Sequence, residues 1–124
     1  MPTRVRPAIE CDRHRAGPKA LLRGHLGTDT GTLFSFAGYS VHDELEFLVR
    51  AGLTPGEALQ AATIRAAEML DAEDEFGTIE PGKCGDVLIL GANPLDDIRN
   101  TRSLETVIAE GRVVDRDALL IRIP

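Results

Sequence analysis

Aromatic residues and basic charge are both scarce in this chain. Aromatic side chains make up 4% of its 124 residues, tryptophan is absent, and the net charge is −6. Proteins that bind nucleic acids commonly stack bases on aromatic rings and neutralise phosphates with a basic surface. The composition therefore argues against nucleic acid as a partner, and any core must be built mainly from aliphatic side chains.

Cysteine is nearly absent, and long apolar runs are missing altogether. Cys11 and Cys84 lie far apart, which excludes the CxxC spacing typical of zinc or redox sites. The first residues hold no apolar segment of a signal peptide, and no run approaches the ~20 apolar residues that cross a membrane. We therefore expect a cytoplasmic protein without a membrane partner.

Basic charge is concentrated at the N-terminus. Residues 1–23 carry six basic and two acidic side chains, a net of +4, so the remainder carries −10. This stretch also has three prolines and no apolar period, which predicts a poorly ordered basic arm. An arm that binds RNA is the alternative interpretation of the same residues.

Two helices are predicted after residue 39. Ser40 is a candidate cap for a helix beginning at Val41, with Asp43 completing a variant capping box and Gly52 ending the helix. The sequence TPGE, from Thr54 to Glu57, predicts a second helix that runs to about Leu70. Its apolar stripe of mostly small side chains is suited to close packing against another element.

The remaining sequence predicts a small β unit. Pro81-Gly82 fits a type II turn, and Val87 to Leu90 is a short apolar strand. Two strand-prone runs, 106–109 and 112–114, flank Glu110-Gly111 and predict a hairpin, and the tail 119–123 is a further candidate strand.

Several motifs occur in a familiar order: GTDTG, SVHDELEFLVRAGLTPGEALQAAT, GTIEPGKCGDVLIL, NPLDDIRNT and VIAEGRVVDR. Together they resemble the C-terminal end of amidohydrolases related to imidazolonepropionase and metal-dependent Xaa-Pro dipeptidases, from about Gly24 to Asp117. The resemblance implies an α/β fragment: the last strand-helix unit of a TIM barrel at 24–72, then a small β-sandwich portion at 73–124. A complete barrel takes about 250 residues, so we expect only its end here.

The resemblance also implies roles for two residues. Asp29 of GTDTG matches the aspartate that binds near the metal and accepts a proton from the metal-bound water, so Asp29 is the candidate catalytic and metal-binding residue. His42 follows in the loop-to-helix segment and is a weaker candidate for substrate binding. Their structural alternatives are an Asx-turn residue for Asp29 and a surface side chain in the first helical turn for His42.

The other metal ligands of that family are not found in this sequence. The family uses an HxH motif, a lysine or glutamate and two further histidines, all upstream of GTD, whereas the three histidines here are never paired at i, i+2 or i, i+4. The complete enzyme is expected to use a divalent metal, and zinc is the metal we expect. We expect no metal bound to this chain alone.

The first functional hypothesis is therefore the C-terminal portion of a metal-dependent hydrolase of amide or other C–N bonds, with cyclic amide or dipeptide-like substrates. It is expected to be inactive alone and to be complemented by an upstream barrel portion. The alternative is a non-catalytic module that forms homo-oligomers through its apolar faces.

Overall fold

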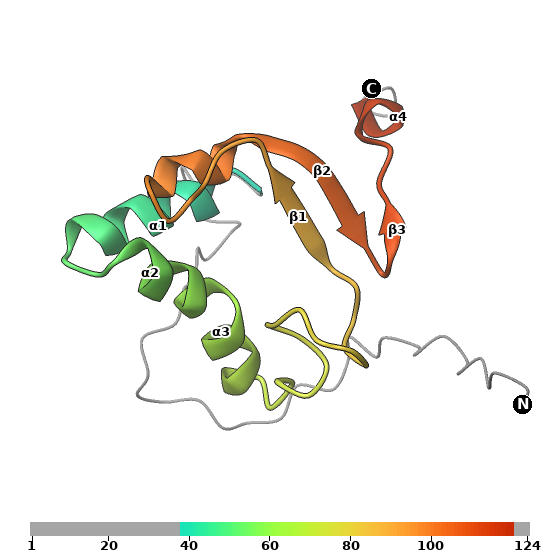
Figure 1. The fold of residues 1–124 in the computed structure, drawn as a ribbon, viewed down its shortest axis with the longest axis horizontal. Coiled ribbons are helices and arrows are strands. Elements are labelled where there is room, and N and C mark those ends of the chain that lie inside the picture. The colour runs from blue at the N-terminus through green and yellow to red at the C-terminus, as the bar shows by residue number, and fades with distance from the viewer. Residues whose placement is uncertain (1–37, 121–124) are drawn as a thin grey trace, which may run out of the picture.

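Helices occupy the first half of the structure and a small sheet the second. The computed structural model describes residues 38–120. The helices are α1 (Ser40–Arg50), α2 (Pro55–Ala62) and α3 (Ile64–Met69). They are followed by β1 (Val87–Leu90), the 3-10 helix η1 (Ile98–Arg102), β2 (Leu104–Ala109), β3 (Arg112–Val113) and α4 (Arg116–Leu120) (Figure 1).

The start of α1 differs from the prediction by one residue. Tyr39, not Ser40, is the N-cap residue, and no side chain caps the helix. Asp43 does not complete a capping box because its carboxylate instead accepts a hydrogen bond from Arg102 at 2.8 Å. The prediction of a Ser40 cap was therefore wrong. The Asp43 carboxylate binds Arg102, which is distant in the sequence, and does not bind the backbone at the start of the helix.

The end of α1 is as predicted. Gly52 has a φ of +113°, and its N–H donates to the Val49 carbonyl at 3.0 Å. The next N–H, of Leu53, donates back to the Leu48 carbonyl at 3.1 Å. These two bonds form a Schellman motif, which requires a residue in the left-handed region and so favours glycine.

The second predicted helix is divided at Thr63. Its capping box is confirmed: the Thr54 side chain accepts from the Glu57 N–H, and the Glu57 carboxylate accepts from the Thr54 N–H at 2.8 Å. The Thr63 hydroxyl donates to the Leu59 carbonyl at 2.8 Å, and its backbone leaves the helical region (φ −122°, ψ −95°). The prediction of one helix to Leu70 was therefore wrong, and α2 and α3 are separate helices.

The connection between α3 and β1 is held close to the helices by glycine. A Cβ on Gly77 would lie 2.7 Å from the Ile64 Cα, and its φ is +95°. The predicted type II turn follows, in which Gly82 has a φ of +97° and the Lys83 N–H donates to the Glu80 carbonyl at 3.2 Å.

The sheet is antiparallel, with strand order β1-β2-β3. The predicted hairpin is confirmed: β2 and β3 are joined by Glu110 and Gly111, both with positive φ (53° and 74°), as a type I′ turn requires. The predicted strand at 119–123 is wrong for residues 119 and 120, which belong to α4, and its other residues lie outside the described range. The Asp115 carboxylate accepts from the Ala118 N–H at 3.1 Å and so favours a helical turn there.

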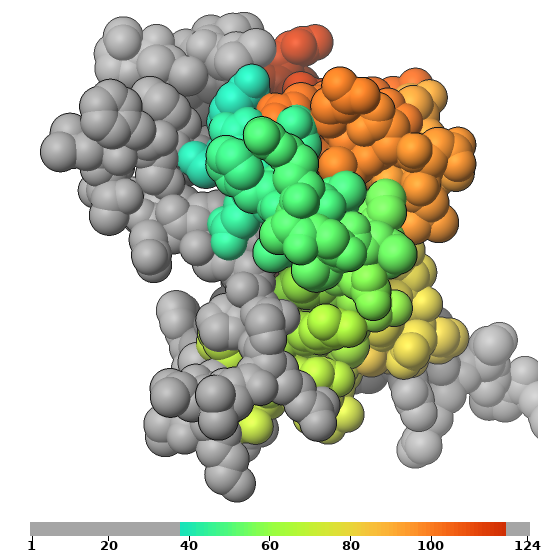
Figure 2. Space-filling view, turned by 90° about the vertical axis from the view of Figure 1, so that its left-hand side faces the viewer, coloured from blue at the N-terminus to red at the C-terminus, as the bar shows by residue number. Residues whose placement is uncertain are grey.

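The buried core lies where the helices meet η1. Leu45 of α1, Ala58 of α2 and Ile98 of η1 are buried together, and four half-buried apolar residues pack around them: Leu48, Val49, Leu59 and Ala62. Figure 2 shows η1, in orange, directly against α1 and α2. The junction of the helices with the β unit is therefore the best-packed part of the described chain.

Outside this core, apolar surface is left open. Eight large hydrophobic side chains are exposed: Tyr39, Phe47, Leu70, Ile79, Leu88, Ile89, Leu95 and Val113. The described residues form one sheet only, so the predicted sandwich stays a prediction, as do the boundaries at residues 23 and 72. Between residues 38 and 120, no helix has the length and apolar character needed to cross a membrane.

Candidate functional site

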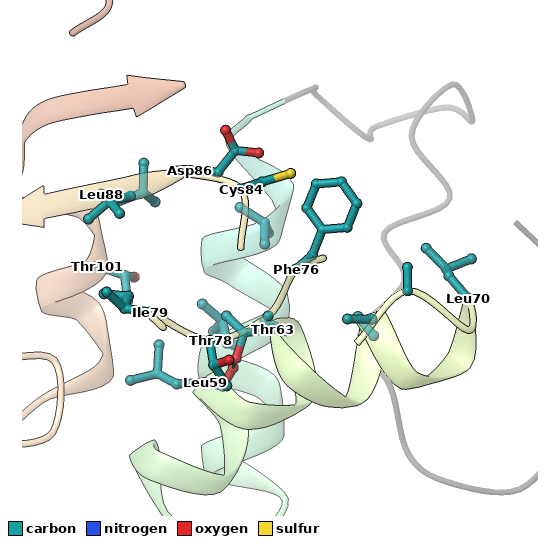
Figure 3. Close-up of a pocket in the computed structure, with 18 of the residues that line it drawn as sticks. Leu59, Thr63, Leu70, Phe76, Thr78, Ile79, Cys84, Asp86, Leu88 and Thr101 are labelled. Atoms are coloured by element: carbon teal, nitrogen blue, oxygen red, sulfur yellow. Dashed lines mark hydrogen bonds between the residues drawn. The ribbon is translucent and has the colours of Figure 1, made fainter. Parts of the chain in front are cut away.

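A cleft of about 630 Å³ separates the helices from β1. Its walls come from α1, α2, α3, the connection to β1, β1 itself and Thr101 of η1. Figure 3 shows the lining side chains, among them Leu59, Leu70, Phe76, Ile79 and Leu88. Most of the lining is apolar, and the polar side chains on its wall include His42, Asp86 and Thr101.

His42 is fixed by a hydrogen bond to η1. It lies in the first turn of α1, and its Nδ1 is 3.0 Å from Thr101 Oγ1. Thr101 is 6% exposed, and its hydroxyl proton is donated to the Ile98 carbonyl at 2.9 Å. The Thr101 oxygen therefore accepts from His42, which assigns the ring proton to Nδ1 and leaves Nε2 as an acceptor.

The charge state of His42 follows from its surroundings. Burial lowers the pKa of its imidazole below the ordinary value of 6.5, and the nearby Arg102 lowers it further, against an opposing effect of Asp43. His42 is therefore neutral at pH 7. A neutral imidazole on the wall of an apolar cleft is suited to accept one hydrogen bond from a ligand. The role of His42 in substrate binding stays a prediction.

Arg102 connects η1 to α1 and was missed by the sequence analysis. Its Nη2 donates to Asp43 at 2.8 Å and to Glu46 at 2.6 Å, and its guanidinium lies 5.1 Å from the centre of the Tyr39 ring. Its Nη1 is buried without a hydrogen-bond partner. Asp43 and Glu46 are spaced i, i+3 and therefore lie on the same face of α1, where one basic side chain can contact both. The sequence did not show which basic residue that would be.

Only one of the two candidate site residues, His42, lies within the described structure. Asp29 lies outside the described residues, so its proposed roles and its position relative to His42 stay predictions. No group of three or more His, Cys, Asp or Glu side chains suited to a metal occurs within residues 38–120. The described residues therefore do not fit a metal site of their own.

The comparisons with known proteins decide the family. The model of the amidohydrolase family matches residues 9–114, which is most of the chain. The chain belongs to the amidohydrolase family. The expected resemblance is therefore confirmed, and enzymes of this family generally use divalent metals.

Among amidohydrolases, the chain is similar to enzymes of different named activities. It is 34% identical over 106 residues to adenine deaminase 4 of Rhizobium meliloti, covering 85% of this chain and 17% of that one. It is 39% identical over 69 residues to imidazolonepropionase of Geobacillus kaustophilus, covering 53% of this chain and 16% of the relative. The crystal structure of a Xaa-Pro dipeptidase with bound methionine superposes with a TM-score of 0.67 at 32% identity, covering 73% of this chain and 21% of that one.

The chain thus spans about a fifth or less of the length of these amidohydrolases. These similarities support a hydrolase acting on C–N bonds as the ancestry of the chain. They also show that the matched region occurs in enzymes with different substrates, so the region by itself does not specify one.

Proposed function

We propose that this chain is the C-terminal portion of a metal-dependent amidohydrolase and hydrolyses C–N bonds only together with an upstream portion. The observation that carries the proposal is a match of residues 9–114 to the amidohydrolase family, together with relatives of which the matched region is only about a fifth or less. The described residues of this chain hold no metal-binding cluster. The upstream portion supplies the remaining metal ligands and most of the substrate pocket. Cyclic amides and dipeptide-like molecules are the proposed substrate class.

Asp29 is the proposed general base. Its carboxylate accepts the proton of the attacking water as that water adds to the substrate. A divalent ion, with zinc as the proposed metal, would be held mainly by residues of the upstream portion and would supply acidification of such a water. His42 is the proposed substrate contact, because its free Nε2 can accept a hydrogen bond from a substrate N–H.

The test is reconstitution from two polypeptides. The 124-residue chain is mixed with the part of Rhizobium meliloti adenine deaminase 4 that precedes the matched region. Ammonia release from adenine is measured with and without added zinc, because this upstream portion, which supplies most of the pocket, comes from an adenine deaminase. We expect turnover in the mixture only. A complex that forms but does not turn over adenine, with zinc present and both parts folded, contradicts the proposal.

A non-catalytic oligomerising module is the second candidate function. It is favoured by the exposed large apolar side chains, of which Ile79 and Val113 are 83% and 71% exposed. Light scattering of the purified chain distinguishes the two: the module requires a stable homo-oligomer that does not dissociate when the upstream polypeptide is added. A folded monomer rules the module out.

A further inference from the structure

Two adjacent residues of η1 bind two adjacent residues of α1. The Nδ1 of His42 lies 3.0 Å from Thr101 Oγ1. The next residue of each element forms a second contact, in which Arg102 Nη2 donates to the Asp43 carboxylate at 2.8 Å. The first contact fixes the position of the imidazole, and the second brings a guanidinium close to it.

The first contact leaves one ring nitrogen of His42 for a ligand. Nδ1 donates to Thr101, whereas Nε2 has no hydrogen-bond partner within residues 38–120. Both residues line the apolar cleft, in which Figure 3 labels Thr101. Protonation of the ring would keep the Nδ1 contact, because Nδ1 donates in both charge states. It would change only Nε2, from an acceptor to a donor.

Opposing charges surround the His42 ring. Burial and Arg102 hold the pKa of the imidazole below 6.5, and Asp43 acts in the other direction. The same guanidinium also donates to Glu46 at 2.6 Å. Asp86 is a further carboxylate on the cleft wall, and it accepts a hydrogen bond from a backbone N–H at 2.7 Å. Arg102 therefore adds a positive charge near the ring and neutralises the two carboxylates of α1 that it binds.

Without Arg102, two carboxylates would remain on one face of α1 with no cation between them. A nearby negative charge favours the protonated form of an imidazole. Nε2 of His42 would then donate a hydrogen bond over a wider pH range and would suit an anionic ligand group. With Arg102 in place, the same atom accepts a hydrogen bond from a neutral ligand.

We propose that Arg102 is a positioning residue that acts through His42: bound to two carboxylates of α1, it keeps Nε2 an acceptor, so that the cleft selects ligands that present an N–H donor there. The ligand class is neutral molecules with an amide, amino or ring N–H, in preference to anions. The inference rests on the proposed function for the assignment of this ligand as the substrate.

The first test measures the pKa of His42 in the full 124-residue chain by NMR titration of the ring nitrogens. His42→Asn assigns the signals among the three histidines. Arg102→Met removes the cation, and Arg102→Lys is the matched control that keeps one. Asp43→Asn removes the opposing carboxylate but keeps the pairing of Arg102 with Glu46, so it tests the same effect in a junction that stays bonded.

We expect the pKa of His42 to rise in Arg102→Met, to stay close to the parent value in Arg102→Lys, and to fall in Asp43→Asn. The Nδ1–H signal should persist in all three variants, because Thr101 still accepts that bond. A role confined to packing predicts a different result. Loosening the junction from either side would expose the ring to water and raise its pKa in both the Arg102 and the Asp43 variant.

The second test concerns ligand selection. Adenine, a neutral molecule with N–H groups, is titrated by calorimetry into the mixture of the chain with the upstream polypeptide of adenine deaminase 4. The Kd of Arg102→Met should rise at least threefold from pH 8 to pH 6, as His42 becomes protonated. The Kd of the parent and of Arg102→Lys should change less over the same range.

Three results overturn the inference: an unchanged His42 pKa in Arg102→Met, a raised pKa in Asp43→Asn, or adenine binding that is absent or has the same pH dependence in parent and Arg102→Met. If Arg102→Met does not fold, Asp43→Asn and Arg102→Lys still decide the direction of the effect. Adenine binding with the expected pH dependence but without turnover supports the inference while contradicting the proposed function, so the two are tested separately.

Discussion

His42 and Arg102 meet at the junction of α1 and η1, where each joins segments nearly sixty residues apart in the sequence. His42 donates to a buried hydroxyl, and Arg102 binds two carboxylates of one helix face. Neither contact uses a neighbour in the chain. Local sequence patterns therefore identified both partners on α1 but not the contacts that they make.

The stability of the junction should depend on the charge of His42. Because the folded-state pKa lies below the unfolded value of 6.5, folding favours the neutral ring. The stabilisation is complete above pH 6.5 and is lost as pH falls through the lower folded-state pKa. We expect denaturation in urea to show this loss below pH 6.5 in the parent chain.

His42→Asn is the control for this pH dependence, since its amide can still donate to Thr101 but does not titrate. The difference in unfolding free energy between parent and variant should change with pH below 6.5 and be flat above it. A difference that stays constant from pH 5 to pH 8 would contradict the assigned direction.

Arg102→Met should destabilise the fold by about 1.5–3 kcal/mol, the range for hydrogen bonds to charged groups. The substitution leaves Asp43 and Glu46 without their shared cation on one face of α1. Arg99→Met is the matched control, because Arg99 pairs with Asp97 on an exposed surface where ion pairs contribute little. Chemical denaturation checks both, and equal losses would show that the Arg102 cluster has no special role.

At the scale of elements, the predicted features that hold are those set by a few adjacent residues. The capping box at Thr54, the glycine end of α1, the Pro81-Gly82 turn and the type I′ hairpin each require particular side chains or positive φ values. The break at Thr63 was not predictable, because a threonine inside an apolar stripe is compatible with a continuous helix. The α4 turn was mistaken for a strand because the tail is rich in aliphatic residues.

Gly77 should be intolerant of any side chain. In Gly77→Ala the new Cβ meets the Ile64 backbone at 2.7 Å and the backbone keeps an unfavourable positive φ. Gly82→Ala has the same φ problem but nothing within 4 Å, so it isolates the conformational effect. We expect Gly77→Ala to lower the thermal midpoint clearly more than Gly82→Ala, and similar midpoints would contradict the close packing of the connection on α3.

At the scale of the whole molecule, the described residues form part of an amidohydrolase with its best packing where η1 meets α1 and α2 and with open apolar surface at β1. The family and the order of its motifs were predictable from the sequence, because motifs are local. The open cleft was not, because it depends on which segments are brought together in space. The barrel strand, the sandwich and the site at Asp29 stay predictions.

Substitution of Asp29 tests the proposed general base directly. In the reconstituted pair, Asp29→Asn should lower turnover by about 10²–10⁴, the usual contribution of a general base, while association is unchanged. Glu110→Gln, a change on the β hairpin far along the chain from GTDTG, is the control that alters charge by the same amount. Full activity of Asp29→Asn would contradict its role as the base.

The central claim is that catalysis needs residues that this chain does not contain. The most direct test measures the zinc content and the adenine turnover of the pure 124-residue chain after dialysis against zinc. The account predicts far less than one zinc per chain and no turnover, with both restored by the upstream polypeptide and abolished by a chelator. One tightly held zinc per isolated chain, together with turnover of a C–N bond, would contradict it.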